Sequence, residues 1–179
     1  MEINSKEYWD KRFSINDWTL SGGELQNRYF YNLLLELIPT NIKDEILSKN
    51  MSICDFGCAE GDGLILFKDN FSASEITGID ISEYALVNAR KKYPNINWVN
   101  SLDKKYQIII SSNTLEHFEN PHEILINLFS HAEDYVILLL PFQEYDRIEE
   151  HFFTFDFDNI IFRYKEFKLI YLIMNMLYM

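Results

Sequence analysis

Short apolar runs alternate with helical patterns from residue 51 onward. Strands are predicted where apolar residues follow one another without polar alternation, as in strands that a parallel sheet buries on both faces. The predicted strands are residues 52–56, 75–81, 97–99, 106–111 and 135–140. Helices are predicted where apolar residues recur every three or four positions, at residues 63–71, 83–93 and 121–132. This order implies right-handed βαβ units in a doubly wound α/β fold.

The first fifty residues show helical spacing and no strand pattern. Helices are predicted at residues 7–13, 24–38 and 44–47, with a break at residues 21–23. With 179 residues, of which 47% are hydrophobic, the chain can bury one sizeable core but is short for two. We therefore expect a single domain in which residues 1–50 form a helical cap on the α/β part, residues 51–179.

Charge and cysteine content narrow the possible partners. A net charge of -12 opposes binding to the phosphates of nucleic acids and to anionic membrane surfaces. The amino terminus lacks the basic and apolar stretches of a signal peptide, so we expect a cytoplasmic protein. The two cysteines, Cys54 and Cys58, are too few for a disulfide framework and are interpreted as small buried hydrophobic residues.

A glycine-rich segment, residues 55–63, follows the first predicted strand and is here called the glycine turn. Gly57 and Gly61 would let the backbone approach a ligand, and Asp80 follows about 20 residues later, where an acid can accept hydrogen bonds from ribose hydroxyls. The G-x-G-x-x-G spacing of nicotinamide cofactor sites is not met in either frame. Three acids in the turn, at positions 55, 60 and 62, would oppose a pyrophosphate and favour a cationic ligand such as S-adenosylmethionine.

These residues resemble the class I S-adenosylmethionine-dependent methyltransferases, a family with a Rossmann-like fold. Asp55, Gly57 and Gly61 match the first motif of the family, with Ala59 at a position that is commonly glycine. By this resemblance, the Gly57 carbonyl would meet the methionine amino group and Asp80 would bind the ribose. The remaining cofactor contacts that the resemblance implies are Ile81 against the adenine, Ser101 and Leu102 after the third strand, and Ser112 and Asn113 after the fourth.

The segment 106–121, which contains Leu115-Glu116-His117, is similar to the stretch after the fourth strand in small-molecule members of the family. In those relatives the Glu-His pair faces the substrate. We therefore interpret His117 as the first candidate for a catalytic base, His151 as the second, and Glu116 as an orienting partner. The sequence spacing of the Glu-His pairs gives no metal-ligand signal, so we expect no metal ion.

Several other side chains are weaker candidates. Residues 8–12 resemble the opening helix of such proteins, and Trp18 or Tyr8 is expected near the cleft, although aromatic residues at helical spacing more often form core. Gln26 and Arg28 are further candidates that could equally belong to an exposed helix face. The remaining histidines, His122 and His131, are assigned to solvent on the last of the three helices.

The end of the chain departs from the family pattern of seven strands. Residues 157–164 are predicted as the final helix and residues 168–175 as a sixth strand, so that the seventh strand is missing. Either the chain is a truncated form, or another subunit, as in a homodimer, or another segment covers the open sheet edge, since such an edge invites association.

Three functions stay open at this point. The first is an S-adenosylmethionine-dependent methyltransferase that acts on an oxygen or nitrogen of a small-molecule acceptor and releases S-adenosylhomocysteine. The second is a catalytically silent relative that serves as a binding partner, and the third is a nicotinamide-dependent oxidoreductase, which the failed glycine spacing disfavours.

Overall fold

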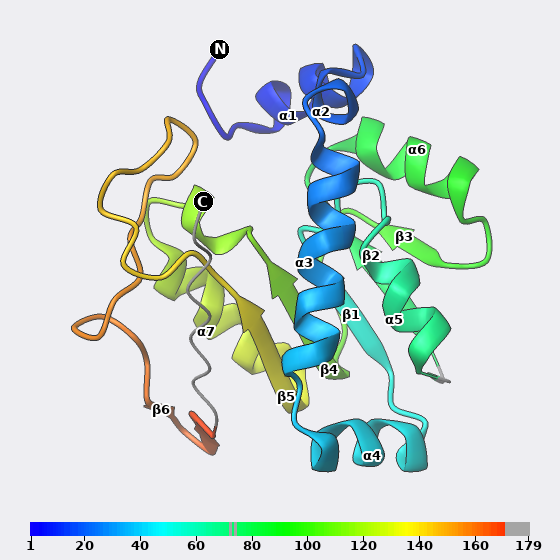
Figure 1. Cartoon of the computed structure of the whole chain (residues 1–179), viewed down its shortest axis with the longest axis vertical. Coiled ribbons are helices and arrows are strands. Elements are labelled where there is room, and N and C mark those ends of the chain that lie inside the picture. Colours follow the sequence, from blue (N-terminus) through cyan, green and yellow to red (C-terminus); the bar gives the residue numbers. More distant parts are fainter. Residues whose placement is uncertain (72, 74, 171–179) are drawn as a thin grey trace.

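The computed structural model describes residues 1–71, 73 and 75–170, and its centre is a five-stranded sheet (Figure 1). The strands lie in the order β3-β2-β1-β4-β5, and each neighbouring pair is parallel. Their bounds are β1 Ile53–Phe56, β2 Ile76–Ile79, β3 Asn97–Val99, β4 Tyr106–Ser112 and β5 Ala132–Leu139. The strand order reverses between β1 and β4, which is where sheets of this kind bind ligands, beyond the carboxyl ends of the strands. The predicted α/β fold is confirmed.

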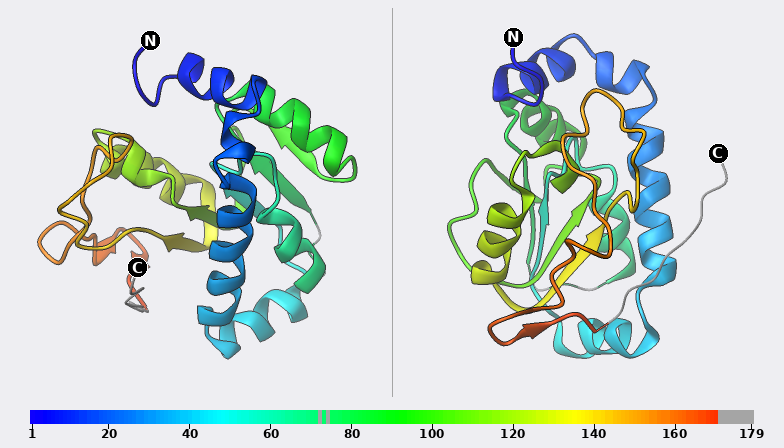
Figure 2. Two further views of the ribbon diagram at one scale, coloured as in Figure 1. Left: turned by 45° about the horizontal axis from the view of Figure 1, so that its top comes forward. Right: turned by 90° about the vertical axis from the view of Figure 1, so that its left-hand side faces the viewer.

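Helices cover both faces of the sheet, as the two views in Figure 2 show. Their bounds are α1 Lys6–Ser14, α2 Asp17–Leu20, α3 Gly23–Leu37, α4 Thr40–Lys49, α5 Leu64–Asn70, α6 Glu83–Lys92, the 3₁₀ turn η1 Leu115–His117, and α7 Pro121–His131. The residues at the start of two helices explain why these helices begin there. Ser82 caps α6 by accepting a hydrogen bond from Ala85 N, and Pro121 occupies the first turn of α7.

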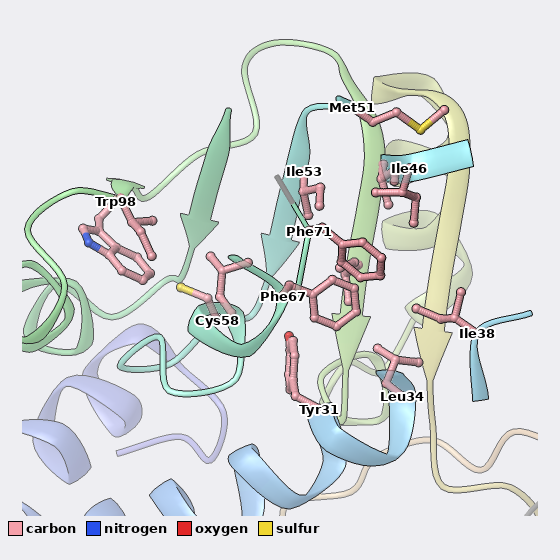
Figure 3. Packing of buried hydrophobic residues seen from close by; sticks show 14 of the residues in the cluster. Tyr31, Leu34, Ile38, Ile46, Met51, Ile53, Cys58, Phe67, Phe71 and Trp98 are labelled. Atoms are coloured by element: carbon pink, nitrogen blue, oxygen red, sulfur yellow. The ribbon is translucent and has the colours of Figure 1, made fainter. Parts of the chain in front are cut away.

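Side chains of the central strand β4 alternate between the two faces of the sheet, and the hydrophobic core therefore has two parts. In β4, Ile108 and Ile110 point to one face and Ile109 to the other. The first face packs against side chains from α3, α4 and α5, and Figure 3 shows Tyr31 and Leu34 of α3 directed toward the sheet. The second face packs against α7. Because α3 and α4 carry buried core residues, the first fifty residues are built into the same core as the sheet.

Helix α1 lies at the carboxyl end of the sheet, beside the start of α6 (Figure 1). Asp10 joins the two helices, because its Oδ1 accepts hydrogen bonds from Ser82 Oγ at 2.7 Å and from Tyr84 N at 3.4 Å. This contact holds α1 above the ligand-binding edge of the sheet.

The segment after β5 differs from the prediction. Residues 157–164 do not form a helix: they are turns and extended chain that lead into a hairpin of β6, Arg163–Tyr164, and β7, Phe167–Lys168. Of the predicted strand 168–175, Lys168 belongs to this hairpin, and residues 171–175 lie outside the described residues. The third predicted helix is longer than expected and spans Thr40–Lys49.

Within the described part of the chain, the five-stranded sheet ends at β5. Across the same residues, we find no helix with the length and apolar character that crossing a bilayer requires.

Candidate active site

The glycine turn is held against the end of β2 and against the segment after β4. The backbone N–H groups of Gly57 and Cys58 both donate to Ile79 O, at 2.8 and 2.9 Å. Gly57 has φ +83°, and a Cβ atom there would lie 2.3 Å from Thr114 Oγ1. No other residue fits this position without strain or displacement. The turn therefore lies in contact with the chain just before Glu116 and His117.

Asp80 is joined to the same turn by two backbone hydrogen bonds. Its Oδ2 accepts from Ala59 N at 2.9 Å and its Oδ1 accepts from Ser82 N at 2.8 Å. Burial raises the pKa of Asp80 to about 6, while these two N–H groups favour the charged form. Ala59 itself has φ +50°, a left-handed conformation that explains why glycine is common at this position.

Asp55 lies at the end of β1 and is completely buried. Its Oδ1 accepts a short hydrogen bond from the Tyr31 hydroxyl, and its Oδ2 has no hydrogen-bond partner. Burial raises the pKa of Asp55 to about 7, although the Tyr31 bond favours the carboxylate. Asp55 therefore offers a buried acceptor at the start of the turn.

The other two acids of the turn do not have the role that their charge suggested. Lys92 of α6 lies 2.7 Å from Glu60 Oε2 and 3.0 Å from Asp62 Oδ2, and Asp62 also accepts from the Tyr93 hydroxyl at 2.7 Å. Asn88 donates to Glu60 Oε1 at 2.7 Å. These carboxylates fasten the turn to α6, and the argument for a cationic ligand rests on the remaining acids at positions 55 and 80.

The other predicted cofactor residues surround this turn at the carboxyl edge. Ile81 exposes 50% of its surface, which leaves an apolar side chain free for a ligand. Ser101 is exposed and Leu102 packs partly against the core. After β4, Ser112 is buried, and Asn113 has φ +48° with its N–H donating to Leu139 O.

Glu116, His117 and His151 form a compact group, here called the histidine cluster. One ligand atom from each of the three side chains lies within 4.8 Å of the other two, and the imidazole rings are 5.1 Å apart. Glu116 is completely buried, and neither of its carboxylate oxygens has a hydrogen-bond partner. Burial raises the pKa of Glu116 to about 8 and lowers the pKa of His117.

Outer contacts orient both rings of the histidine cluster. His117 Nδ1 lies 2.9 Å from Glu150 O, and His151 Nδ1 lies 2.5 Å from Glu144 Oε2. Because a carbonyl or carboxylate oxygen can only accept, each Nδ1 must carry the hydrogen. In the neutral His151 ring, Nε2 therefore presents a lone pair, which lies 3.9 Å from Glu116 Oε1. The His117 ring is also hydrogen-bonded to the backbone of Asn113.

Helix α1 and the residues before it close one side of the histidine cluster. Trp9 makes an edge contact with His117 at 5.4 Å between ring centroids, and the Tyr8 hydroxyl donates to Glu150 Oε1 at 2.8 Å. Asn4 donates to the carbonyl oxygens of His117 and Glu150. Of the two aromatic residues expected near the cleft, Tyr8 thus comes close, whereas Trp18 packs against Phe13 and Gly23.

Sequence reasoning missed Asn4, Trp9, Glu144 and Glu150, because no local pattern distinguishes them from surface residues. It also misplaced His122, which packs against Phe153 and places Nε2 2.8 Å from Asn159 O. The other weak candidates lie on helices: Gln26 is exposed on α3, where Arg28 is half-buried, and His131 bonds to Asn127 O within α7.

Comparisons with known proteins agree with this geometry. A family model described as a methyltransferase domain matches residues 25–154. The ubiquinone biosynthesis O-methyltransferase of Rickettsia prowazekii is 30% identical over 146 residues, which are 73% of this chain and 56% of that protein. The corresponding protein of Rickettsia bellii is 29% identical over 107 residues, 54% of this chain and 42% of that protein. The chain thus spans about half the length of the curated relatives it matches.

Solved structures share the fold at low sequence identity. The plantazolicin methyltransferase BpumL in complex with S-adenosylhomocysteine aligns with a TM-score of 0.56 and 21% identity, over 79% of this chain and 60% of that one. DesVI of Streptomyces venezuelae aligns with a TM-score of 0.52 and 19% identity, over 74% and 58%. Together with the matched family model, these findings show that the chain belongs to the class I S-adenosylmethionine-dependent methyltransferases.

Proposed function

We propose that this protein transfers a methyl group from S-adenosylmethionine to an oxygen atom of a small-molecule acceptor. One observation carries the proposal: the glycine turn touches Thr114, two residues before the histidine cluster begins. A donor held over the turn would therefore face the histidine cluster. The matched relatives named as O-methyltransferases support oxygen as the acceptor atom.

The residues of the turn fit an adenosyl donor. S-adenosylmethionine supplies an activated methyl group when it is bound. Asp80 keeps lone pairs for ribose hydroxyls, since each carboxylate oxygen already engaged with one N–H can accept again. The Gly57 carbonyl would meet the methionine part, Thr114 fills the space where a Gly57 side chain would lie, and the exposed Ile81 offers an apolar surface to the adenine. Ala59, Gly61, Ser101, Leu102, Ser112 and Asn113 complete the proposed contact set.

The histidine cluster supplies the groups for the acceptor. We propose His117 as the first candidate for the base that accepts the hydroxyl proton of the acceptor, because burial lowers the pKa of His117 and so favours the neutral ring. His151 is the second candidate for the same role, with Glu116 beside it. Positioning alone can supply much of the rate, since the methyl group is already activated.

The cap and the sheet edge complete the proposal. Residues 1–50 would act as a helical cap of the α/β part, residues 51–179, because α1 lies over the histidine cluster through Trp9. The outer side of β5 would be covered by a further segment or by a second copy of the chain. Analytical ultracentrifugation over a range of concentrations distinguishes a dimer from a monomer.

Calorimetric titration of S-adenosylhomocysteine into the wild-type chain and the Asp80→Ala variant tests the donor site. We expect the variant to lose about tenfold to a hundredfold in affinity, because hydrogen bonds to a charged carboxylate contribute about 1.5–3 kcal/mol. Asp69→Ala, which removes an exposed acid on α5, serves as the matched control and should bind normally. Equal affinity of all three proteins would contradict the assignment of Asp80.

A panel of hydroxyl-bearing and amine-bearing acceptors, assayed with labelled donor, tests the reaction. Methylation of a hydroxyl acceptor that His117→Ala slows at least tenfold supports the proposal. Tight donor binding without turnover on the whole panel would instead favour the silent binding relative. Stabilisation by NAD and not by S-adenosylhomocysteine would favour the oxidoreductase.

A further inference from the structure

Residues 80–82, here called the donor segment, follow β2 directly and contain the acid assigned to the ribose. Asp80 Oδ2 accepts from Ala59 N at 2.9 Å, and its Oδ1 accepts from Ser82 N at 2.8 Å. The glycine turn therefore holds one carboxylate oxygen of Asp80, and Ser82 holds the other. Because Ser82 is completely buried, any contact that keeps it in place also sets the direction of the Asp80 carboxylate.

Helix α1 supplies the contact that keeps Ser82 in place. Asp10 Oδ1 accepts from Ser82 Oγ at 2.7 Å, and Asp10 Oδ2 pairs with Lys6 at 2.5 Å. The Ser82 hydroxyl also accepts from Ala85 N at 3.2 Å. A hydroxyl has a single hydrogen, so the bond to Asp10 uses the only donor of this side chain. Asp80 is thus two hydrogen bonds away from helix α1.

The same helix contacts the histidine cluster through the residues next to Asp10. The Trp9 ring meets the His117 ring at 5.4 Å between centroids, and the Tyr8 hydroxyl donates to Glu150 Oε1 at 2.8 Å. The Glu150 carbonyl oxygen in turn lies 2.9 Å from His117 Nδ1. Helical hydrogen bonds hold neighbouring residues of α1 in a fixed relation. A displacement of the helix at Asp10 therefore also moves Trp9 relative to His117.

We propose that Asp10 is a positioning residue that couples the donor side of the reaction site to the acceptor side. The donor affects α1 because its ribose binds Asp80 best in the orientation that Ser82 and Asp10 fix, and this orientation keeps α1 over the histidine cluster. Such coupling is reciprocal, so a bound acceptor also raises the affinity for the donor. The inference rests on the proposed function, since it requires the ribose at Asp80. An Asp10 that only joined two helices would affect stability and would not act through Asp80.

A double-mutant cycle on S-adenosylhomocysteine affinity, measured by calorimetry on the full chain, tests whether Asp10 acts through Asp80. We expect Asp10→Ala to weaken binding about fivefold to tenfold in the wild-type background and less than about twofold in the Asp80→Ala background, which lacks the carboxylate that Asp10 positions. Asp10→Asn keeps an oxygen that accepts from Ser82, so its affinity should stay within about threefold of the wild type. Glu7→Ala removes an exposed acid of the same helix and is the matched control, which should bind normally.

Hydrogen exchange of the α1 amides tests the coupling in a second way that does not depend on activity. Saturating S-adenosylhomocysteine should slow exchange in α1 at least about fivefold in the wild type and should leave it unchanged in Asp10→Ala. The amides of α4, which lies at the opposite end of the sheet (Figure 1), are the internal control. Circular dichroism establishes that each variant is folded.

The proposal is overturned if the losses from Asp10→Ala and Asp80→Ala simply multiply in the double variant. Exchange in α1 that S-adenosylhomocysteine does not slow in the wild type would also overturn it. Both results would leave donor binding, and with it the proposed function, standing. A wild-type chain that does not bind S-adenosylhomocysteine would contradict the proposed function and the coupling together.

Discussion

The glycine turn and the histidine cluster differ in how their buried polar groups are satisfied. Beside the glycine turn, Asp80 accepts two backbone hydrogen bonds; within the turn, Glu60 and Asp62 share Lys92, and one oxygen of Asp55 has no partner. In the histidine cluster, neither oxygen of the buried Glu116 has a hydrogen-bond partner, although the three side chains lie close together.

This difference indicates that the glycine turn is a preformed surface, whereas the histidine cluster keeps buried polar groups without partners. The glycine turn is stabilised by its own contacts with α3, β2 and α6. The histidine cluster is held in place by contacts outside it, from Glu144, Glu150 and the backbone after residue 151. Its stability and its chemistry should therefore depend on what it binds, whereas those of the glycine turn should depend on the protein alone.

The largest expected effect comes from filling the space at Gly57. Gly57→Ala should lower the free energy of unfolding by about 3 kcal/mol and abolish measurable S-adenosylhomocysteine binding, because the new Cβ combines a positive φ with a contact at 2.3 Å to Thr114. Gly22→Ala is the control, since Gly22 has φ +86° but no atom within 4 Å. Chemical denaturation and calorimetry measure both quantities. Equal losses of stability and affinity in the two variants would show that the close packing of Gly57 against Thr114 contributes to neither quantity.

A pH effect of similar size is expected from Asp55. Its pKa is raised on folding to about 7, so the folded protein binds the proton more tightly than the unfolded chain, and the free energy of unfolding should fall as the pH rises from about 4 to about 7. The fall is on the order of 3 kcal/mol. Asp55→Asn should remove the Asp55 share of the slope, while Glu116 and Asp80, whose pKa values burial raises to about 8 and about 6, keep the rest. Urea denaturation at several pH values measures the slope, and Asp69→Asn is the control.

Removal of the Lys92 charge should affect stability and leave the donor site nearly unchanged. Lys92→Met leaves Glu60 and Asp62 buried without their cation, which should cost about 2 kcal/mol of the free energy of unfolding. The S-adenosylhomocysteine affinity should change less than about threefold, because these acids fasten the turn to α6. Lys91→Met, one position away and exposed, should be silent in both measurements. A large loss of S-adenosylhomocysteine affinity would instead indicate that Glu60 and Asp62 contribute to cofactor binding.

The smallest effect is expected at Ile81, whose role depends on the ligand. Ile81→Ala should change the free energy of unfolding by less than about 0.5 kcal/mol, since half of the side chain is already exposed. It should weaken S-adenosylhomocysteine binding about fivefold through lost packing with the adenine. Ile126→Ala, on α7, is the control. Unchanged affinity at Ile81 would remove it from the proposed site.

Most of the fold was predictable because the local pattern of apolar residues agrees with the strands and helices that the sheet requires. Strands such as Asn97–Val99 and Tyr106–Ser112 are apolar runs between helical segments, and the structure places their ends within one residue of the prediction. The predicted helix at 157–164 is wrong because turn chemistry competes with apolar spacing. Asp156 Oδ1 accepts from Asp158 N, and Asn159 Oδ1 accepts from Asp156 N, which stabilises a turn.

The candidate site could be proposed from the sequence only where its residues share one stretch of chain. The glycine turn and Leu115-Glu116-His117 are continuous motifs, so the pattern singled them out as candidates. His151 meets His117 only after the chain has passed through α7 and β5, and Glu144 and Glu150 follow from that same folding. Residue spacing could not reveal this approach of the two rings.

The structure of the full chain with S-adenosylhomocysteine bound is the most direct test of the central claim, that the glycine turn and the histidine cluster are the two sides of one reaction site. We predict that the ribose hydroxyls bond to the Asp80 carboxylate and that the sulfur is directed toward His117 and His151. A nucleoside bound elsewhere, or one whose sulfur points away from the histidine cluster, would contradict the account.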